Sequence, residues 1–104
     1  MIIFNLLTPT RKEAEQACEL ILRKKFALHA FIDEAIDEYI LEDDEIVHIQ
    51  LVRVICITKA MLFNDIEQAI HQEFIGNDFR YYATPVTQVD DKEAQRMRKE
   101  LPKG

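Results

Sequence analysis

The residues that could bind a metal ion are few and widely spaced in this sequence. The histidines are His29, His48 and His71, and the cysteines are Cys18 and Cys56. They form no H-x-x-H, H-x-x-x-H or C-x-x-C pattern, although zinc and softer metals need convergent ligands of this kind. Packing between copies of the chain could still bring His48 into a shared site. We therefore keep His48 as a candidate metal ligand.

The acidic residues do not indicate an enzyme active site. Glu42, Asp43, Asp44 and Glu45 are adjacent in one short segment, where carboxylates repel one another and stay ionised in water. The sequence has no G-x-S-x-G motif, phosphate-binding loop or dinucleotide fingerprint. We predict a non-enzymatic protein with no catalytic residues and no required cofactor.

Charge and hydropathy limit the partners and the compartment. The 104 residues include 13 Lys and Arg against 19 Asp and Glu, for a net charge of −6. A nucleic-acid partner needs a concentrated basic face, which these scattered cations do not provide. No apolar stretch approaches the roughly eighteen residues of a membrane span, and the first residues lack the basic region of a signal peptide. We expect a cytoplasmic protein with neither a nucleic-acid nor a membrane partner, whose two cysteines are buried thiols.

Hydrophobic periodicity predicts a single domain covering residues 1–104. Thr10 and Glu13 form a T-x-x-E capping box, which is typical of the start of a helix. The expected strands are residues 2–7, 26–41, 45–58 and 79–89, and the expected helices are residues 11–25, 59–74 and 92–101. This order predicts an α+β fold, a ferredoxin-like βαββαβ sandwich with a C-terminal helix and a four-stranded antiparallel sheet. Both long helices are expected on one face of that sheet, because parallel crossovers are right-handed.

The strand predicted at 45–58 is apolar on both sides in its second half. If the hairpin turns between Asp43 and Asp44, the register places Arg53 opposite Glu34 and turns Leu51, Ile55 and Ile57 toward the helices. The opposite face then carries the residues predicted to form an interface between chains, namely Phe31, Tyr39, Val52, Val54 and Cys56. Each large apolar side chain left in water forgoes roughly 1.5–3 kcal/mol, and such a patch normally marks an interface. The alternative is that the C-terminal helix folds under this face.

Several short segments together resemble the CutA-type divalent-cation tolerance family. Tyr39 falls on the Tyr of the family's I-Y-x-W segment. The other matching segments are T-P-T-R-K-E-A, K-K-F-A-L-H-A-F-I, E-D-D-E-I-V-H-I-Q, T-K-A-M-L-F and A-T-P-V. The resemblance implies a homotrimer of ferredoxin-like subunits packed through their sheets, with no established catalytic activity. It also implies a role in tolerance of copper or other divalent cations, with room for an unidentified protein partner.

The sequence departs from this family at several positions. It has no Trp, and Asp33 and Glu34 replace the family's Pro-Gly before the hairpin. Leu6 falls near the position of a Cys proposed as a copper ligand. His71 is the nearest match to the His of the family's H-P-Y-E-x-P segment, which makes it a second candidate metal ligand.

Two other protein families, one of trimeric regulators and one of amino-acid sensors, are alternatives with a similar ferredoxin-like arrangement of elements. One alternative is a small-ligand regulatory trimer resembling the PII signalling proteins, which use a long mobile loop between the second and third strands. Here that connection is a tight acidic turn. The other alternative is an ACT-like amino-acid sensor, which usually accompanies a further domain.

Overall fold

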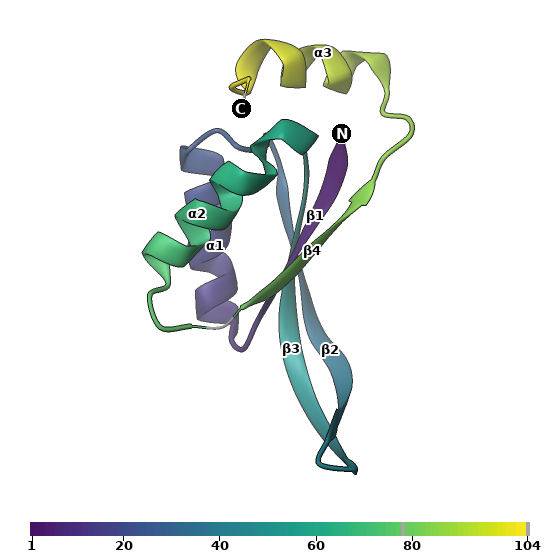
Figure 1. Cartoon of the computed structure of the whole chain (residues 1–104). Coiled ribbons are helices and arrows are strands. Elements are labelled where there is room, and N and C mark those ends of the chain that lie inside the picture. Colours follow the sequence, from purple (N-terminus) through teal and green to yellow (C-terminus); the bar gives the residue numbers. More distant parts are fainter. Residues whose placement is uncertain (78, 104) are drawn as a thin grey trace.

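The computed structural model describes residues 1–77 and 79–103 as a sheet with helices packed on one face (Figure 1). Among these residues, no helix is both long and apolar enough to cross a bilayer. The strands are β1 (Ile2–Thr8), β2 (Ala30–Glu42), β3 (Glu45–Thr58) and β4 (Arg80–Pro85). The helices are α1 (Arg11–Arg23), the short 3-10 helix η1 (Ala60–Leu62), α2 (Phe63–Glu73) and α3 (Asp91–Glu100).

The sheet has the strand order β2-β3-β1-β4, and every neighbouring pair is antiparallel. Strand β1 is central: its Phe4 lies opposite Cys56 on β3 and opposite Ala83 on β4. Pro85 ends β4, an edge strand, where its missing N–H removes no ladder hydrogen bond between neighbours. This topology confirms the predicted ferredoxin-like α+β fold.

The helix starts follow from capping side chains. Thr10 caps α1 as predicted, because the Glu13 backbone N–H donates to Thr10 Oγ1 at 3.3 Å and Thr10 Oγ1 donates to Glu13 Oε1 at 2.9 Å. Asp90 caps α3 in the same way, accepting from the Glu93 N–H at 2.9 Å. Each cap satisfies one of the helix's unpaired N–H groups.

Three predicted boundaries were wrong. Strand β4 ends at Pro85 rather than at Val89. Strand β2 begins at Ala30 rather than at Phe26, because Lys25 turns the chain at a φ of 58° after α1 ends. The predicted helix 59–74 is divided into η1 and α2, whose N-terminal residue is Phe63.

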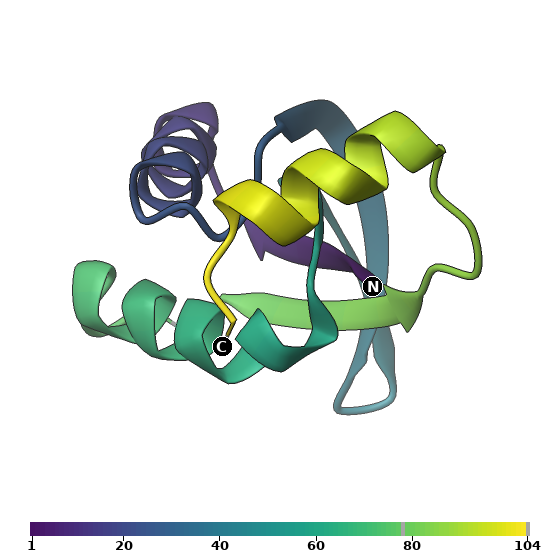
Figure 2. The same ribbon diagram turned by 90° about the horizontal axis from the view of Figure 1, so that it is seen from above.

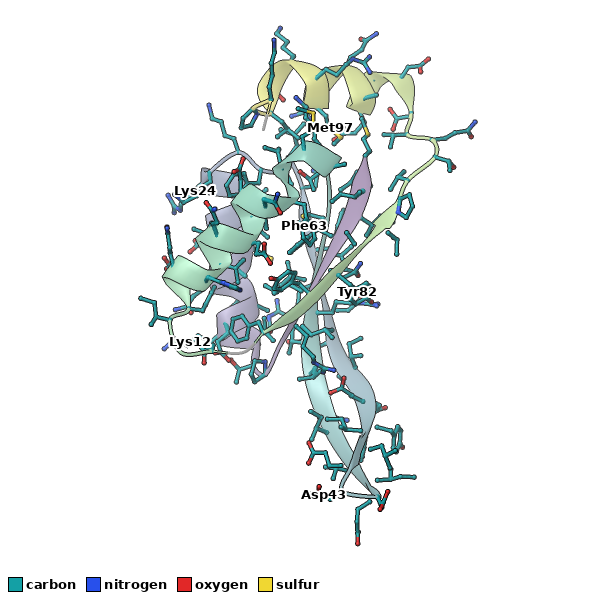
Figure 3. All side chains as sticks on the ribbon, viewed as in Figure 1. Lys12, Lys24, Asp43, Phe63, Tyr82 and Met97 are labelled. Carbon is teal, nitrogen blue, oxygen red and sulfur yellow. The ribbon has the colours of Figure 1, made fainter. Side chains whose placement is uncertain are left out.

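The main core lies between the sheet and α1 and α2. Small residues Ala14 and Ala17 bring α1 close to the strands, while Ile66 and Ile70 belong to α2. Met97 points from α3 toward the ends of the strands and is buried (Figure 3). These contacts join all three helices in one hydrophobic cluster.

The C-terminal helix does not cover the second face of the sheet. Seen from above, α3 lies across the upper ends of the strands (Figure 2). Leu101, just after it, is buried, and Lys59 Nζ donates to the carbonyl oxygens of Leu101 and Pro102 at 3.1 and 3.0 Å. The start of α3 borders the upper end of the face opposite α1 and α2, where Asp90 and Glu93 line a hollow with Phe31 and Ile57. The chain's own tail leaves the rest of that face open.

The hairpin of β2 and β3 extends well beyond the rest of the sheet, with Asp43 at its far end (Figures 1 and 3). Pairing with β1 stops where Thr8 lies opposite Val52, so within the described part of the chain the segment of β3 before Val52 pairs with β2 alone. We call residues 36–51 the hairpin arm. A two-stranded ribbon of this kind is marginally stable in water on its own.

Two local distortions shape the arm. The register between β2 and β3 shifts between Asp33 and Ile36, where Ala35 has a φ of 56°. This is a β-bulge, which adds a residue to one strand and increases the local twist. At the far end, Asp43 and Asp44 have φ values of 48° and 65°, as the two central residues of a type I′ turn require.

The turn conformation leads to a test of arm stability. Asp44→Ala places a Cβ-bearing residue without a compensating side-chain hydrogen bond in the left-handed region, and we expect arm opening to become easier by about 1 kcal/mol. Asp44→Gly should leave the arm at least as stable as in the wild type. Hydrogen exchange of the amides of residues 36–51 measures this difference. Equal protection in both variants would show that the turn does not control the arm.

Candidate functional site

The face of the sheet opposite α1 and α2 is rich in branched apolar side chains. Side chains alternate along a strand, so the neighbours of the core residues Phe4, Leu6 and Val54 point to this face. We call it the open face. Its apolar members are Ile3, Leu7, Phe31, Ile36, Ile40, Val47, Ile49, Leu51, Ile55 and Ile57. Such a patch on an otherwise charged surface indicates an interaction site.

Three residues predicted for the interface lie instead in the chain's own core. Val54 and Cys56 are fully buried and Val52 is 9% exposed, all beneath the helices on the side of Phe4 and Leu6. The predicted assignment of the two faces was therefore reversed along β3. The smaller side chains of β3, Val54 and Cys56, lie under the helices, where the alanines of α1 let the helix approach the sheet closely. The larger Ile55 and Ile57 lie on the open face.

The open-face residues Ile49, Ile55 and Ile57 were missed because both sides of β3 are apolar. Arg53 is the signal that could have identified them. A charged side chain is almost never fully buried, and Arg53 shares its side of the strand with Leu51 and Ile55. That side should have been assigned away from the helices.

The two other residues predicted for the interface are exposed. Phe31 is 59% exposed and lies opposite Ile55, on the open face, because the bulge changes the register of β2. Tyr39 is 70% exposed and, because side chains alternate along a strand, lies on the side of the hairpin arm opposite to Ile40. Leu41 and Ile46 accompany Tyr39 and are also exposed. The arm thus presents apolar side chains on both of its sides.

The open face also carries charged side chains. Arg53 Nη2 donates to Asp33 Oδ2 at 2.8 Å, and this bond, followed by one with Tyr82, raises the pKa of Arg53. The predicted partner Glu34 is displaced by the bulge and pairs with Arg11 at 2.8 Å instead. Within the described residues, Arg53 Nε is buried without a hydrogen-bond partner.

His48 belongs to a polar cluster on the side of the arm that carries Tyr39. Its Nε2 lies 2.8 Å from Asp37 Oδ1, and Gln50 Nε2 donates to the same oxygen at 3.2 Å. The His48 and Tyr39 rings are stacked, with centroids 4.6 Å apart. The hydrogen bond from His48, and then that from Gln50, lowers the pKa of Asp37 below its usual value, which keeps this exposed carboxylate ionised to lower pH.

The candidate metal ligands do not converge in one chain. His71 is exposed on α2, and its ring packs in a T-shaped arrangement with the Tyr81 ring, with centroids 6.1 Å apart. Helix α2 is well separated from the hairpin arm, which carries His48 (Figure 1). Across residues 1–77 and 79–103, no three His, Cys, Asp or Glu side chains are grouped as a metal site requires. One chain therefore supplies two separate histidine–carboxylate pairs, His48 with Asp37 at 2.8 Å and His29 with Glu93 at 3.1 Å, and neither pair is a complete copper or zinc site.

The arrangement of strands and helices defines a protein of the ferredoxin-like class in which the hairpin of β2 and β3 is extended. Among solved structures, this architecture is similar to that of the CutA1 divalent cation tolerance proteins. CutA1 from Oryza sativa superimposes with a TM-score of 0.89 at 13% identity, covering 99% of this chain and 94% of the other. The divalent cation tolerance protein of Thermus thermophilus gives 0.87 at 13% identity, covering 98% and 100%.

Another solved structure extends the comparison. CutA1 from Ehrlichia chaffeensis gives a TM-score of 0.83 at 20% identity, covering 94% of this chain and 92% of its own. No model of a known protein family matches the sequence, and no curated protein matches it either. At these identities the likeness establishes the fold, and it agrees with the resemblance found in the sequence.

The corrected position of Cys56 is testable by thiol chemistry. Burial raises the pKa of Cys56 to about 12, so at pH 8 it has almost no thiolate, the reactive form. We expect Ellman's reagent to modify at most Cys18 in the native protein and both thiols in denaturant. Cys18→Ser should then leave no reactive native thiol, even after dilution. Reaction of Cys56 on dilution would instead place it in an interface between chains.

Proposed function

We propose that this chain is a non-enzymatic CutA-type protein that assembles as a cytoplasmic homotrimer through the open face and the hairpin arm. The full-length likeness to proteins named for divalent cation tolerance supports the type of protein. The family resemblance in the sequence supplies the number of three subunits. The observation that carries the proposal is the hairpin arm, which has apolar side chains on both sides and, among residues 1–77 and 79–103, no third strand beside it.

The energetics favour association over an isolated chain. Phe31, Ile49, Tyr39, Leu41 and Ile46 are all exposed in one chain. Burying a side chain of this kind contributes roughly 1.5–3 kcal/mol, against the entropic cost of bringing chains together. A neighbouring copy that covers the open face and holds the arm removes both the exposed apolar surface and the marginal stability of a free hairpin.

Chain association has a direct test in solution. Sedimentation equilibrium should give a particle of three times the 12.2 kDa chain mass. Ile55→Asp places a charge in the middle of the open face and should reduce the particle to single chains. Met61→Asp, on the exposed surface of η1, is the matched control and should remain trimeric. A monomeric wild-type protein would refute the proposal.

The connection with divalent metals is a separate part of the proposal. Within the described residues one chain supplies histidine–carboxylate pairs, His48 with Asp37 and His29 with Glu93, but no group of three ligands, so we propose that a bound divalent cation is shared between chains through His48. His71, the other candidate, has no hydrogen bond or ion pair within the described residues.

Calorimetric titration with Cu²⁺ or Zn²⁺ distinguishes the two histidines. We expect the binding heat of the wild-type trimer to disappear in His48→Ala and to persist in His71→Ala. The opposite pattern would assign the metal to α2. If neither cation produces heat with the wild-type trimer, metal binding is excluded from the proposed function, and a role in assembly with other proteins is favoured.

The hairpin turn favours this assignment over a PII-like regulatory trimer. The connection between β2 and β3 consists of Asp43 and Asp44 in a tight turn. A PII-like protein places its long mobile loop at this point in the chain.

A further inference from the structure

A groove of about 580 Å³ lies between the end of α1 and the second half of α3. It has apolar side chains at its base and mostly cationic side chains around its rim. The lining residues are Leu22, Lys25, Ala27, Leu28, Arg96, Lys99 and Glu100. Small-molecule sites have this range of volume, with a few polar groups beside apolar side chains. These residues belong neither to the open face nor to the hairpin arm, so the assembly proposed above leaves the groove accessible.

Opposite charges are collected in different parts of the molecule. Strand β2, the acidic turn and the first half of β3 carry Asp and Glu but neither Lys nor Arg. The end of α1 instead carries the cationic run 23–25, and α3 carries Arg96 and Lys99 in its second half. Figure 3 shows Lys24 in the upper part of the molecule, as α3 is, and Asp43 at the lower end. The groove therefore lies in the cationic part of an acidic chain, which favours an anionic ligand.

Lys25 occupies a backbone position that usually holds glycine. Helix α1 ends in a Schellman motif, in which the Phe26 N–H donates to the Ile21 carbonyl oxygen at 3.0 Å. The Lys25 N–H donates to the Leu22 carbonyl oxygen at 3.0 Å, and Lys25 has a φ of 58°. A residue with a Cβ is disfavoured in this left-handed conformation, which glycine adopts freely. Backbone strain of this kind is concentrated at functional sites, and here it holds an ammonium group at the rim of the groove.

The positive charges at the rim are only partly compensated. Arg96 Nη2 lies 3.2 Å from Glu100 Oε2, so this guanidinium already has a carboxylate partner. Among residues 1–77 and 79–103, neither Lys25 nor Lys99 forms an ion pair. Both lysines are exposed, and the apolar side chain of Leu22 beside them is 40% exposed. A ligand in the groove can therefore reach two ammonium groups and an apolar surface together.

We propose that this groove binds a phosphate monoester carried on a short apolar body. Such an ester has a charge of about −1.5 to −2 at pH 7 and three acceptor oxygens, which match two ammonium groups. Lys25 Nζ and Lys99 Nζ donate charge-assisted hydrogen bonds to the phosphate oxygens, and the apolar body packs on Leu22 and Leu28. A carboxylate matches less well, because its single charge balances only one of the lysines. Neither the metal nor the interface proposed above takes part in this site.

The probe for the experiment is n-butyl phosphate, compared with butyrate, which has one negative charge, and with n-butanol, which has none. Amide NMR spectra of the full chain should show saturable shifts at Leu22, Ala27 and Leu28 with butyl phosphate. Butyrate should bind more weakly, and butanol should cause no saturable shift. Lys99→Gln should weaken the binding of butyl phosphate roughly fivefold, because it removes a charge-assisted hydrogen bond. The spectrum of each variant also reports whether it folds.

Lys25→Gly separates a role in binding from a role in folding. It should raise the melting temperature, because glycine adopts a positive φ without strain. It should also weaken the binding of butyl phosphate roughly fivefold, because the ammonium group is lost. Lys25→Arg keeps the positive charge and should bind nearly as tightly as the wild type. Unchanged affinity in Lys25→Gly would overturn the proposal and leave Lys25 with a structural role only.

The matched control is Lys24→Gln, which removes a positive charge from the same turn at a residue that does not line the groove. We expect it to change the affinity by less than about twofold, as for exposed charges in general. A loss as large as that in Lys99→Gln would overturn the proposal, by showing that the ligand responds to the overall positive field. Binding of vesicles that contain phosphatidic acid, without binding of butyl phosphate, would also overturn it in favour of a membrane-docking surface.

The groove site and the proposed trimer can fail separately. Ile55 lies on the open face, so we expect the folded, monomeric Ile55→Asp variant to bind butyl phosphate as the wild type does. Loss of binding in that variant would overturn the assignment of the site to a single chain. Conversely, a monomeric wild-type protein that binds butyl phosphate would refute the trimer and support the groove site.

Discussion

Strand β1 is half as long as the strand it supports, seven residues against fourteen, and this mismatch governs the rest of the molecule. Where β1 is present, β3 is a central strand with hydrogen bonds on both sides and a helix layer above it. In the arm, past the point where Thr8 pairs with Val52, the described residues place neither a third strand nor a helix beside the hairpin. The same hairpin thus passes from a well-packed core to a ribbon whose stability depends on what lies against it.

The open face combines this dependence with a set of fixed charges. Arg53 and Glu38 each have one buried side-chain atom with no hydrogen-bond partner among the described residues, and both lie among branched apolar side chains. Covering that face is favourable for the apolar groups, but it is costly for any charge that gains no partner. Any occupant of the face must therefore supply both apolar surface and hydrogen-bonding groups at defined positions. This requirement restricts the partners that can bind the face to those with matching polar groups.

The order and type of the elements could be predicted from the sequence, because the capping box at Thr10, the acidic turn and the hydrophobic periodicities agree with one another. The faces of β3 could not be assigned from hydrophobicity, since Val54 and Ile55 are equally apolar and only Arg53 distinguishes the two sides. The bulge at Ala35 was also missed, because alanine has no preference for positive φ and so gives no local signal. That single added residue determines the side on which Phe31 lies and the acid that pairs with Arg53.

The ion pair between Glu38 and Arg80, on the open face, has an origin that no local pattern reveals. Glu38 and Arg80 belong to opposite edges of the sheet and meet only because the long hairpin twists across the open face. Sequence separation and strand order both suggest that they are far apart. Their contact depends on the curvature of the sheet, which the bulge in β2 increases.

Strand β2 is also a long outer strand of the sheet, and its composition bears on how the newly made chain avoids misassembly. An exposed edge of thirteen residues is a template on which other chains can add strands without limit. Here five acids interrupt it, namely Asp33, Glu34, Asp37, Glu38 and Glu42, and the bulge breaks its regular ladder. Repulsion between the acidic side chains of two such edges opposes the addition of further strands. Strand β2 can therefore contribute to an apolar interaction surface without nucleating amyloid.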